Sequence, residues 1–215
     1  MTTHGESRWT SLETKSSTAF LVGGLLWVLD TMLLGIELFA GVSILGTPGP
    51  VNPILYVSGT IVACIGLLGF YPELADRAPW TARLSAGVVA IAGTALSLLL
   101  IWFITVNILN QPDPPGALLV LSILGVALSF VLFGVAGVWT GVPSRMIGFL
   151  LLGVVATIIG GIVLVYVIFG GNSPDWTSPA IGAGVSVILL MVSSLLRSDP
   201  LRTSHEDPAS DSAAR

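Results

Sequence analysis

Long neutral stretches alternate with short segments that carry the charges, and this pattern runs through the whole chain. Six stretches hold about 20 consecutive, predominantly apolar residues, the length of an α-helix that crosses a hydrocarbon core of about 30 Å. They are residues 18–39, 53–71, 84–108, 116–139, 146–169 and 180–196. The pattern therefore predicts an all-α fold, an integral membrane bundle of six transmembrane helices.

The polar segments at the two ends divide the chain into three parts. Residues 1–17 form an N-terminal segment, 18–197 the six-helix transmembrane domain and 198–215 a polar tail. The tail has no aromatic or β-branched run whose burial would offset its ordering entropy, so we expect it to be disordered. A cleaved secretory signal is the alternative for the first stretch. Its apolar run is about twice as long as the hydrophobic region of a signal, so we expect a retained helix.

Proline positions agree with this division of the chain. Proline breaks the interior of a helix but is tolerated at helix starts and in loops. All 13 prolines lie outside the six stretches or at their edges. Since the stretches were defined by hydropathy alone, the prolines support them independently.

Basic residues indicate the orientation, because Lys and Arg are retained on the cytoplasmic side of a membrane. The three loops 40–52, 109–115 and 170–179 contain neither residue type. The remaining segments hold all eight basic residues: Arg8, Lys15, Arg77, Arg83, Arg145, Arg197, Arg202 and Arg215. We therefore predict a multi-pass protein of the cell membrane with both termini in the cytoplasm.

Composition supports a membrane protein and narrows its function. The chain is 53% hydrophobic and 9% charged, whereas soluble domains carry about 25% charged residues. Both histidines, His4 and His205, lie in the terminal segments, and Cys64 is the single cysteine. The stretches thus offer no haem ligand, no metal cluster and no base for a nucleophile. We expect no enzyme activity and no cofactor, and without a basic patch no nucleic-acid binding.

Two acidic residues, Asp30 and Glu37, lie inside the first stretch. A helical rise of about 1.5 Å per residue places Asp30 near the midplane and Glu37 at the outer boundary. Their spacing of seven residues puts both on one helix face. A carboxylate at the centre of a membrane helix costs about 2.5–3.5 kcal/mol, and no basic residue lies in any stretch to neutralise it. We therefore expect Asp30 to be protonated, to hold a cation or to face water.

Other polar residues in the outer half extend this candidate site. The full set is Asp30, Glu37, Tyr56, Asn107 and Tyr166, which together could line a vestibule that faces outward. Structural roles are the alternatives: a hydrogen bond between helices for Asp30, and extension to the interface for Glu37. Hydroxyl side chains such as Thr60 and Ser129 have the simpler alternative of bonding to a carbonyl of their own helix.

Glycine is the most informative of the small residues. The chain has 25 glycines, and small residues let membrane helices approach closely. The clearest rows are Gly137 with Gly141, and Gly153 with Thr157 and Gly161. They predict a tight bundle in the lipid bilayer, and such Gly-rich faces also suit a homo- or hetero-oligomer.

The stretch GFYPELADRAP at residues 69–79 carries a family resemblance. With this stretch, the six-span layout and the acidic, lysine-poor termini, the chain resembles small multi-pass membrane proteins of halophilic archaea. That group has no assigned function, so the resemblance implies a fold and transfers no catalytic or binding residues. We expect the charged part of this region, 72–83, to be a solvated loop.

Two functions remain open from the sequence. The first is a non-enzymatic polytopic protein that serves as an accessory or packing subunit of a membrane assembly. The second is a transporter or channel for a small solute, proton or cation that uses Asp30 and Glu37. A water-accessible cavity that reaches Asp30 would favour transport, whereas a dry, packed environment would favour the structural role.

Overall fold

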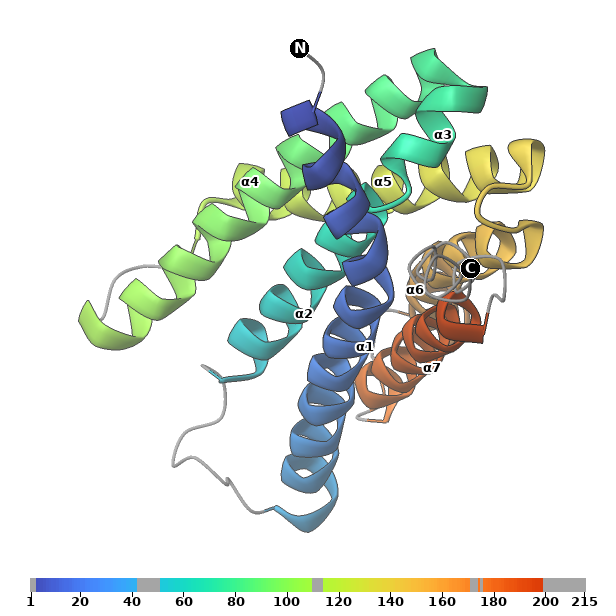
Figure 1. The fold of residues 1–215 in the computed structure, drawn as a ribbon. Coiled ribbons are helices and arrows are strands. Elements are labelled where there is room, and N and C mark those ends of the chain that lie inside the picture. The colour runs from blue at the N-terminus through green and yellow to red at the C-terminus, as the bar shows by residue number, and fades with distance from the viewer. Residues whose placement is uncertain (1–2, 42–50, 110–113, 171–173, 175, 199–215) are drawn as a thin grey trace, which may run out of the picture.

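The computed structural model describes residues 3–41, 51–109, 114–170, 174 and 176–198. All regular structure in these ranges is helical, which confirms the predicted all-α class (Figure 1). The helices are α1 (Thr3–Ala40), α2 (Val51–Leu68), α3 (Tyr71–Arg77), α4 (Pro79–Leu109), α5 (Gly116–Thr140), α6 (Arg145–Ile168) and α7 (Thr177–Ser198). The predicted tail lies outside the described residues, except for Ser198 at the end of α7.

Five helical segments are long and apolar enough to cross a membrane. They are Lys15–Ala40, Pro79–Thr105, Gly116–Thr140, Arg145–Ile168 and Thr177–Ser198. The second predicted stretch differs, because Pro53–Leu68 and Tyr71–Arg77 meet the same criteria only together and bend by 40° where they join. The described part of the chain thus holds five candidate spans, or six if the bent pair crosses as one.

Pro72 explains why α2 does not continue. Proline has no backbone N–H, so Pro72 cannot donate to the carbonyl four residues earlier, that of Leu68. The chain instead tightens at this point, where Gly69 and Phe70 donate to Gly66 and Leu67, three residues back, at 3.1 Å each. Pro72 then occupies the first turn of α3, where the missing N–H costs nothing.

Helix α3 corrects the expectation of a solvated loop at 72–83. Residues 71–77 are helical and Leu74 is fully buried, while α4 already begins at Pro79. The Arg77 guanidinium donates from Nη1 to the carbonyl oxygen of Thr140 at 3.0 Å. A cation there compensates the unpaired carbonyls at the C-terminal end of α5. Part of this charged segment therefore connects α3 to α5 by a hydrogen bond.

The six long helices form a closed ring. Neighbours in the chain pack together, as do α1 and α7, so that contacts run in the order α1, α2, α4, α5, α6, α7 and back to α1. Figure 1 shows α1 between α2 and α7. The first and last helices are joined further by a hydrogen bond of 2.8 Å from Ser193 Oγ to the Ser17 carbonyl.

Glycines set the closest approaches in this ring. A Cβ on Gly23 of α1 would lie 2.9 Å from the carbonyl oxygen of Gly59 on α2, so neither helix has room for a side chain there. Of the predicted rows, Gly137 packs on α6 at Gly148 and Gly161 packs on α7, whereas a Cβ on Gly141 would meet nothing within 4 Å. The prediction of a tight bundle is therefore confirmed within the described residues.

Aromatic contacts align the ends of the helices. Phe70, which follows α2, stacks on Phe20 near the start of the apolar part of α1, with ring centroids 5.7 Å apart, and lies 6.4 Å from the ring of Phe133 near the end of α5. The chain after α2 has therefore returned to the level at which the apolar part of α1 begins. The six basic residues in the described ranges belong to this end: Arg8, Lys15, Arg77, Arg83, Arg145 and Arg197.

The outside of the ring is apolar, as a surface in contact with lipid requires. Large side chains such as Leu25, Ile101 and Phe149 are exposed on it. Helix α1 begins at Thr3 and runs without interruption into the first span. Most of the predicted N-terminal segment is thus a continuation of that helix.

Candidate functional site

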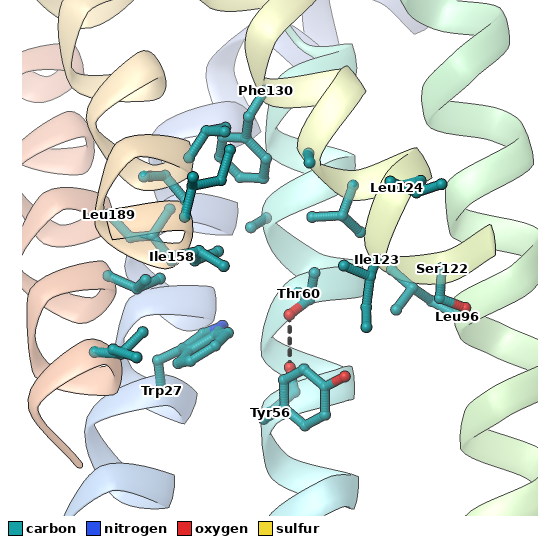
Figure 2. A pocket seen from close by; sticks show the side chains of 18 of the residues that line it. Trp27, Tyr56, Thr60, Leu96, Ser122, Ile123, Leu124, Phe130, Ile158 and Leu189 are labelled. Atoms are coloured by element: carbon teal, nitrogen blue, oxygen red, sulfur yellow. Dashed lines mark hydrogen bonds between the residues drawn. The ribbon is translucent and has the colours of Figure 1, made fainter. Parts of the chain in front are cut away.

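A cavity of about 400 Å³ lies inside the ring of helices. All six long helices contribute to its wall, from Trp27 on α1 and Tyr56 on α2 to Leu189 on α7. Figure 2 shows Trp27 and Tyr56 at one end of the cavity and Phe130 at the other. Its volume is within the range of roughly 300–1,000 Å³ typical of ligand sites.

The wall of this cavity is almost entirely aliphatic and aromatic. Hydroxyl groups come from Tyr56, Thr60 and Ser122, and the described wall residues include none with a charge. Thr60 Oγ1 donates to the Tyr56 carbonyl at 2.7 Å and Ser122 Oγ to the Leu118 carbonyl at 2.8 Å. Two of the three hydroxyl protons are thus already used, and the cavity offers few groups that can hold water.

Asp30 lies beside this cavity but does not form its wall. It follows Trp27 by one turn of α1, and its side chain is 8% exposed. Its Oδ1 atom is buried with no hydrogen-bond partner among the described residues. Trp27, one turn earlier on α1, contacts the ring of Tyr56 on α2. The structure therefore places Asp30 one helical turn from the contact between α1 and Tyr56.

Tyr56 lies at one end of the cavity, next to Trp27 (Figure 2). Its ring packs edge-on against Trp27, with centroids 5.6 Å apart and an interplanar angle of 74°. Such a contact is favourable for aromatic quadrupoles and fixes both side chains at the end of the cavity. Tyr56 is thus the one member of the predicted set that, among the described residues, lines the cavity.

The other predicted members are spread over the bundle. Glu37 lies near the end of α1 and is half-buried, whereas Tyr166 on α6 is 70% exposed on the outside of the ring. Asn107 belongs to the last turn of α4, and its side chain is outside the described residues. In the described part of the chain, Tyr56 is therefore the predicted member that lines the cavity, and Asp30 is buried on α1 one turn from Trp27.

Most hydroxyl side chains in the helices bond to their own backbone, which confirms that expectation. The acceptor in each case is the carbonyl four residues earlier, at 2.7 to 2.8 Å. The residues are Thr60, Thr94, Ser97, Thr105, Ser129, Thr157 and Ser186. Because each of these hydroxyls donates its proton to the backbone, it has no second donor to offer to a solute.

Sequence reasoning did not find the cavity or a row of small residues on the outside of α4. The row consists of Gly87, Ala90, Thr94 and Ser97, and all four are exposed. Their spacing of three and four residues is a readable signal, since a surface in contact with lipid usually carries larger side chains. The cavity has no such signal, because its wall residues are of the same types as those that face lipid.

The cavity wall is better suited to contact with an apolar molecule than with a polar or charged one. Within the described ranges, no group of three or more His, Cys, Asp or Glu side chains is placed to hold a metal ion. No protein-family model matches the chain, and no curated protein or solved structure is similar enough to count as a match. Function must therefore be argued from the bundle itself.

Proposed function

We propose that the chain is a non-enzymatic, multi-pass protein of a cell membrane that works as an accessory or packing subunit of a membrane assembly. In this proposal α2 and α3 together form the second of six spans, and both termini lie in the cytoplasm. The stacking of Phe70 on Phe20 supports the six-span count, because the chain after α2 is level with the start of the first span. The basic residues at that same end support the orientation.

One observation supports the packing role: Asp30 is not among the residues that line the cavity. A transport path needs groups that replace the hydration of the solute along its way. The cavity wall is almost entirely apolar, Asp30 and Glu37 do not contribute to it, and two of its three hydroxyls are bonded to backbone. The interior cavity is thus too apolar to serve as an aqueous path for a charged solute.

The exposed row of small residues on α4 is the place where we expect a partner helix. It lies between two grooves, one of about 390 Å³ shared with α2 and one of about 330 Å³ shared with α5. Small side chains let a second helix approach closely, and the grooves on either side can receive its larger side chains. A second copy of this chain is the partner we propose, since isologous pairing is the commonest form of association.

Transport through Asp30 is the second candidate, and one observation favours it. A buried carboxylate oxygen without a hydrogen-bond partner is costly, and such a group in a membrane helix often binds a proton or cation. Asp30 would then be the core of an ion site. The weakness of this candidate is that the wall of the cavity beside Asp30 carries no charge and only three hydroxyl groups among the described residues.

Ion flux in proteoliposomes separates the two functions. The purified chain and its Asp30→Asn variant would be reconstituted and exposed to a proton or Na⁺ gradient, with protein-free vesicles as the control. We expect no flux above the control from either protein. A flux that the natural chain supports and Asp30→Asn abolishes would reverse the order of the two proposals.

A further inference from the structure

The central cavity is a defect in an otherwise closely packed bundle. Glycine contacts bring α5 and α6 together at one end, where a Cβ on Gly148 would meet the backbone of Gly134 and Gly137. Away from that end the same two helices form part of the wall of a cavity of about 400 Å³. An empty space of this size forfeits the dispersion contacts of every side chain around it, so a matching occupant is favoured.

Water is a poor occupant for this cavity. A buried water molecule makes about three hydrogen bonds, and apolar cavities that cannot supply them stay dry or take up apolar molecules. Thr60 and Ser122 already donate to carbonyls of their own helices. The remaining wall around them consists of side chains such as Phe130, Ile158 and Val185. The occupant must therefore be apolar along most of its length.

The surface of the bundle shows where that occupant enters. Four wall residues are also large apolar side chains exposed on the surface: Ile123 and Leu124 on α5 at 53% and 62%, and Ile159 and Ile162 on α6 at 52% and 46%. The cavity is thus continuous with the outer surface between these two helices. In a membrane that surface meets hydrocarbon chains, which are the most abundant apolar molecules at this depth.

We propose that the cavity binds a hydrocarbon chain of a membrane lipid, which enters sideways between α5 and α6 and extends toward Trp27 and Tyr56. The uncharged wall accepts the chain and gives the charged part of a headgroup no partner, so the headgroup stays outside the ring. Transfer from bilayer to cavity gains little hydrophobic free energy, so the preference rests on the fit of the chain to the wall. This site is independent of the packing role and of Asp30.

Trp27 provides a reporter inside the site. A form that keeps Trp27 and carries Phe at the other five tryptophan positions would be placed in vesicles of phosphatidylcholine brominated near the middle of its acyl chains. Bromine quenches indole fluorescence only at close range, so a chain in the cavity should quench Trp27 strongly. Ala127→Phe fills the cavity from its wall and should reduce the quenching at least twofold. Ala117→Phe, at an exposed position of the same helix, should leave it unchanged.

A second measurement uses the natural tryptophans and guards against misfolding of the reporter form. The chain would be extracted from dioleoyl phosphatidylcholine vesicles in mild detergent and weighed by native mass spectrometry. We expect one retained lipid per chain, loss of that lipid in Ala127→Phe and in the smaller change Ala127→Leu, and retention in Ala117→Phe. Equal lipid content in the natural chain and both Ala127 variants would overturn the proposal. So would quenching of Trp27 by aqueous acrylamide, which requires a water-filled cavity.

Discussion

Gly148 on α6 lies directly against Gly134 on α5, so that a Cβ on Gly148 would be 2.8 Å from the Gly134 carbonyl oxygen and 2.7 Å from the Val138 nitrogen. Both atoms belong to the backbone and cannot move aside as the end of a side chain can. The turn after α5 holds the two helices at this distance: Gly141 ends α5 with φ +71°, and Ser144 Oγ accepts from the Ile147 N–H at 3.2 Å at the start of α6. The approach is thus built into the local sequence.

Gly148→Ala should therefore separate α5 from α6 and lower the free energy of unfolding by roughly 1–3 kcal/mol, the usual cost of overpacking. Gly160→Ala is the matched control, because Gly160 lies on the same helix with open space where its Cβ would be. Alanine has the higher helix propensity, so the control should be unchanged or slightly more stable. Unfolding in mixed micelles, followed by circular dichroism, measures both. Equal stabilities would show that this contact does not hold the helices together.

Cross-linking tests the proposed contact on α4. In a two-fold dimer through the row of small residues, Ala90 of one copy approaches Ala90 of the other. In a Cys64→Ala background, Ala90→Cys should give disulfide-linked dimers in native membranes, because a disulfide requires Cβ atoms about 3.5–4.5 Å apart. Leu25→Cys is the control, since Leu25 is exposed at a comparable depth on α1. Dimers from Leu25→Cys, or none from Ala90→Cys, would contradict a copy-to-copy contact through α4.

Much of the fold can be predicted from hydropathy. The number of consecutive apolar residues gives the length of a helix, and this length can be compared directly with the thickness of a bilayer. The predicted runs at 84–108, 116–139 and 180–196 each lie inside a single observed helix, 18–39 lies inside α1, and 146–169 extends one residue beyond the end of α6. The break in the second run had a signal in Pro72, whose missing N–H ends the pattern of backbone bonds. Hydropathy averages over such a position and does not register it.

The candidate site was less accessible to sequence reasoning. Asp30 could be found because a charge is conspicuous in a long apolar run, and its side chain is buried. The cavity could not, because Ile158 inside it and Ile159 at its exposed edge are the same residue type one position apart. Whether an isoleucine faces a neighbour, a void or lipid depends on the distances between helices. The resemblance to proteins of halophilic archaea remains a prediction.

Asp30→Leu tests whether the buried carboxyl has a partner. Its Oδ1 atom has none among the described residues, and a buried polar group without a hydrogen bond costs about 1–3 kcal/mol. Replacement by leucine removes that cost, so the free energy of unfolding should rise by roughly 1 kcal/mol. Asp30→Asn keeps a polar group of the same size and should be nearly neutral. A marked loss of stability in Asp30→Leu would instead indicate a bound cation or proton that stabilises the natural chain.

The six-span topology can be tested at two loops, because a bent pair that crosses the membrane and one that re-enters it give opposite results. If α2 and α3 form one span, a cysteine at Asp76 faces the cytoplasm and a cysteine at Asp175 faces outside. If the pair instead turned back to the outer side, every later segment would be inverted, with Asp76 outside and Asp175 inside. Arg83, Arg145 and Arg197 would then also lie outside, against the retention of basic residues in the cytoplasm.

We therefore expect a membrane-impermeant maleimide, applied to intact cells, to label Asp175→Cys and to leave Asp76→Cys unlabelled until the membrane is opened. Both variants would carry Cys64→Ala, which removes the single native thiol. Asp76 is exposed, so its failure to react in intact cells would reflect its side of the membrane and not its burial. The stacking of Phe70 on Phe20 supports this expectation, because it places Phe70 level with the start of the apolar part of α1, and the basic residues at that end favour the cytoplasm. Labelling of Asp76→Cys alone in intact cells would mean that α2 does not span the membrane, and the six-span proposal would fall with it.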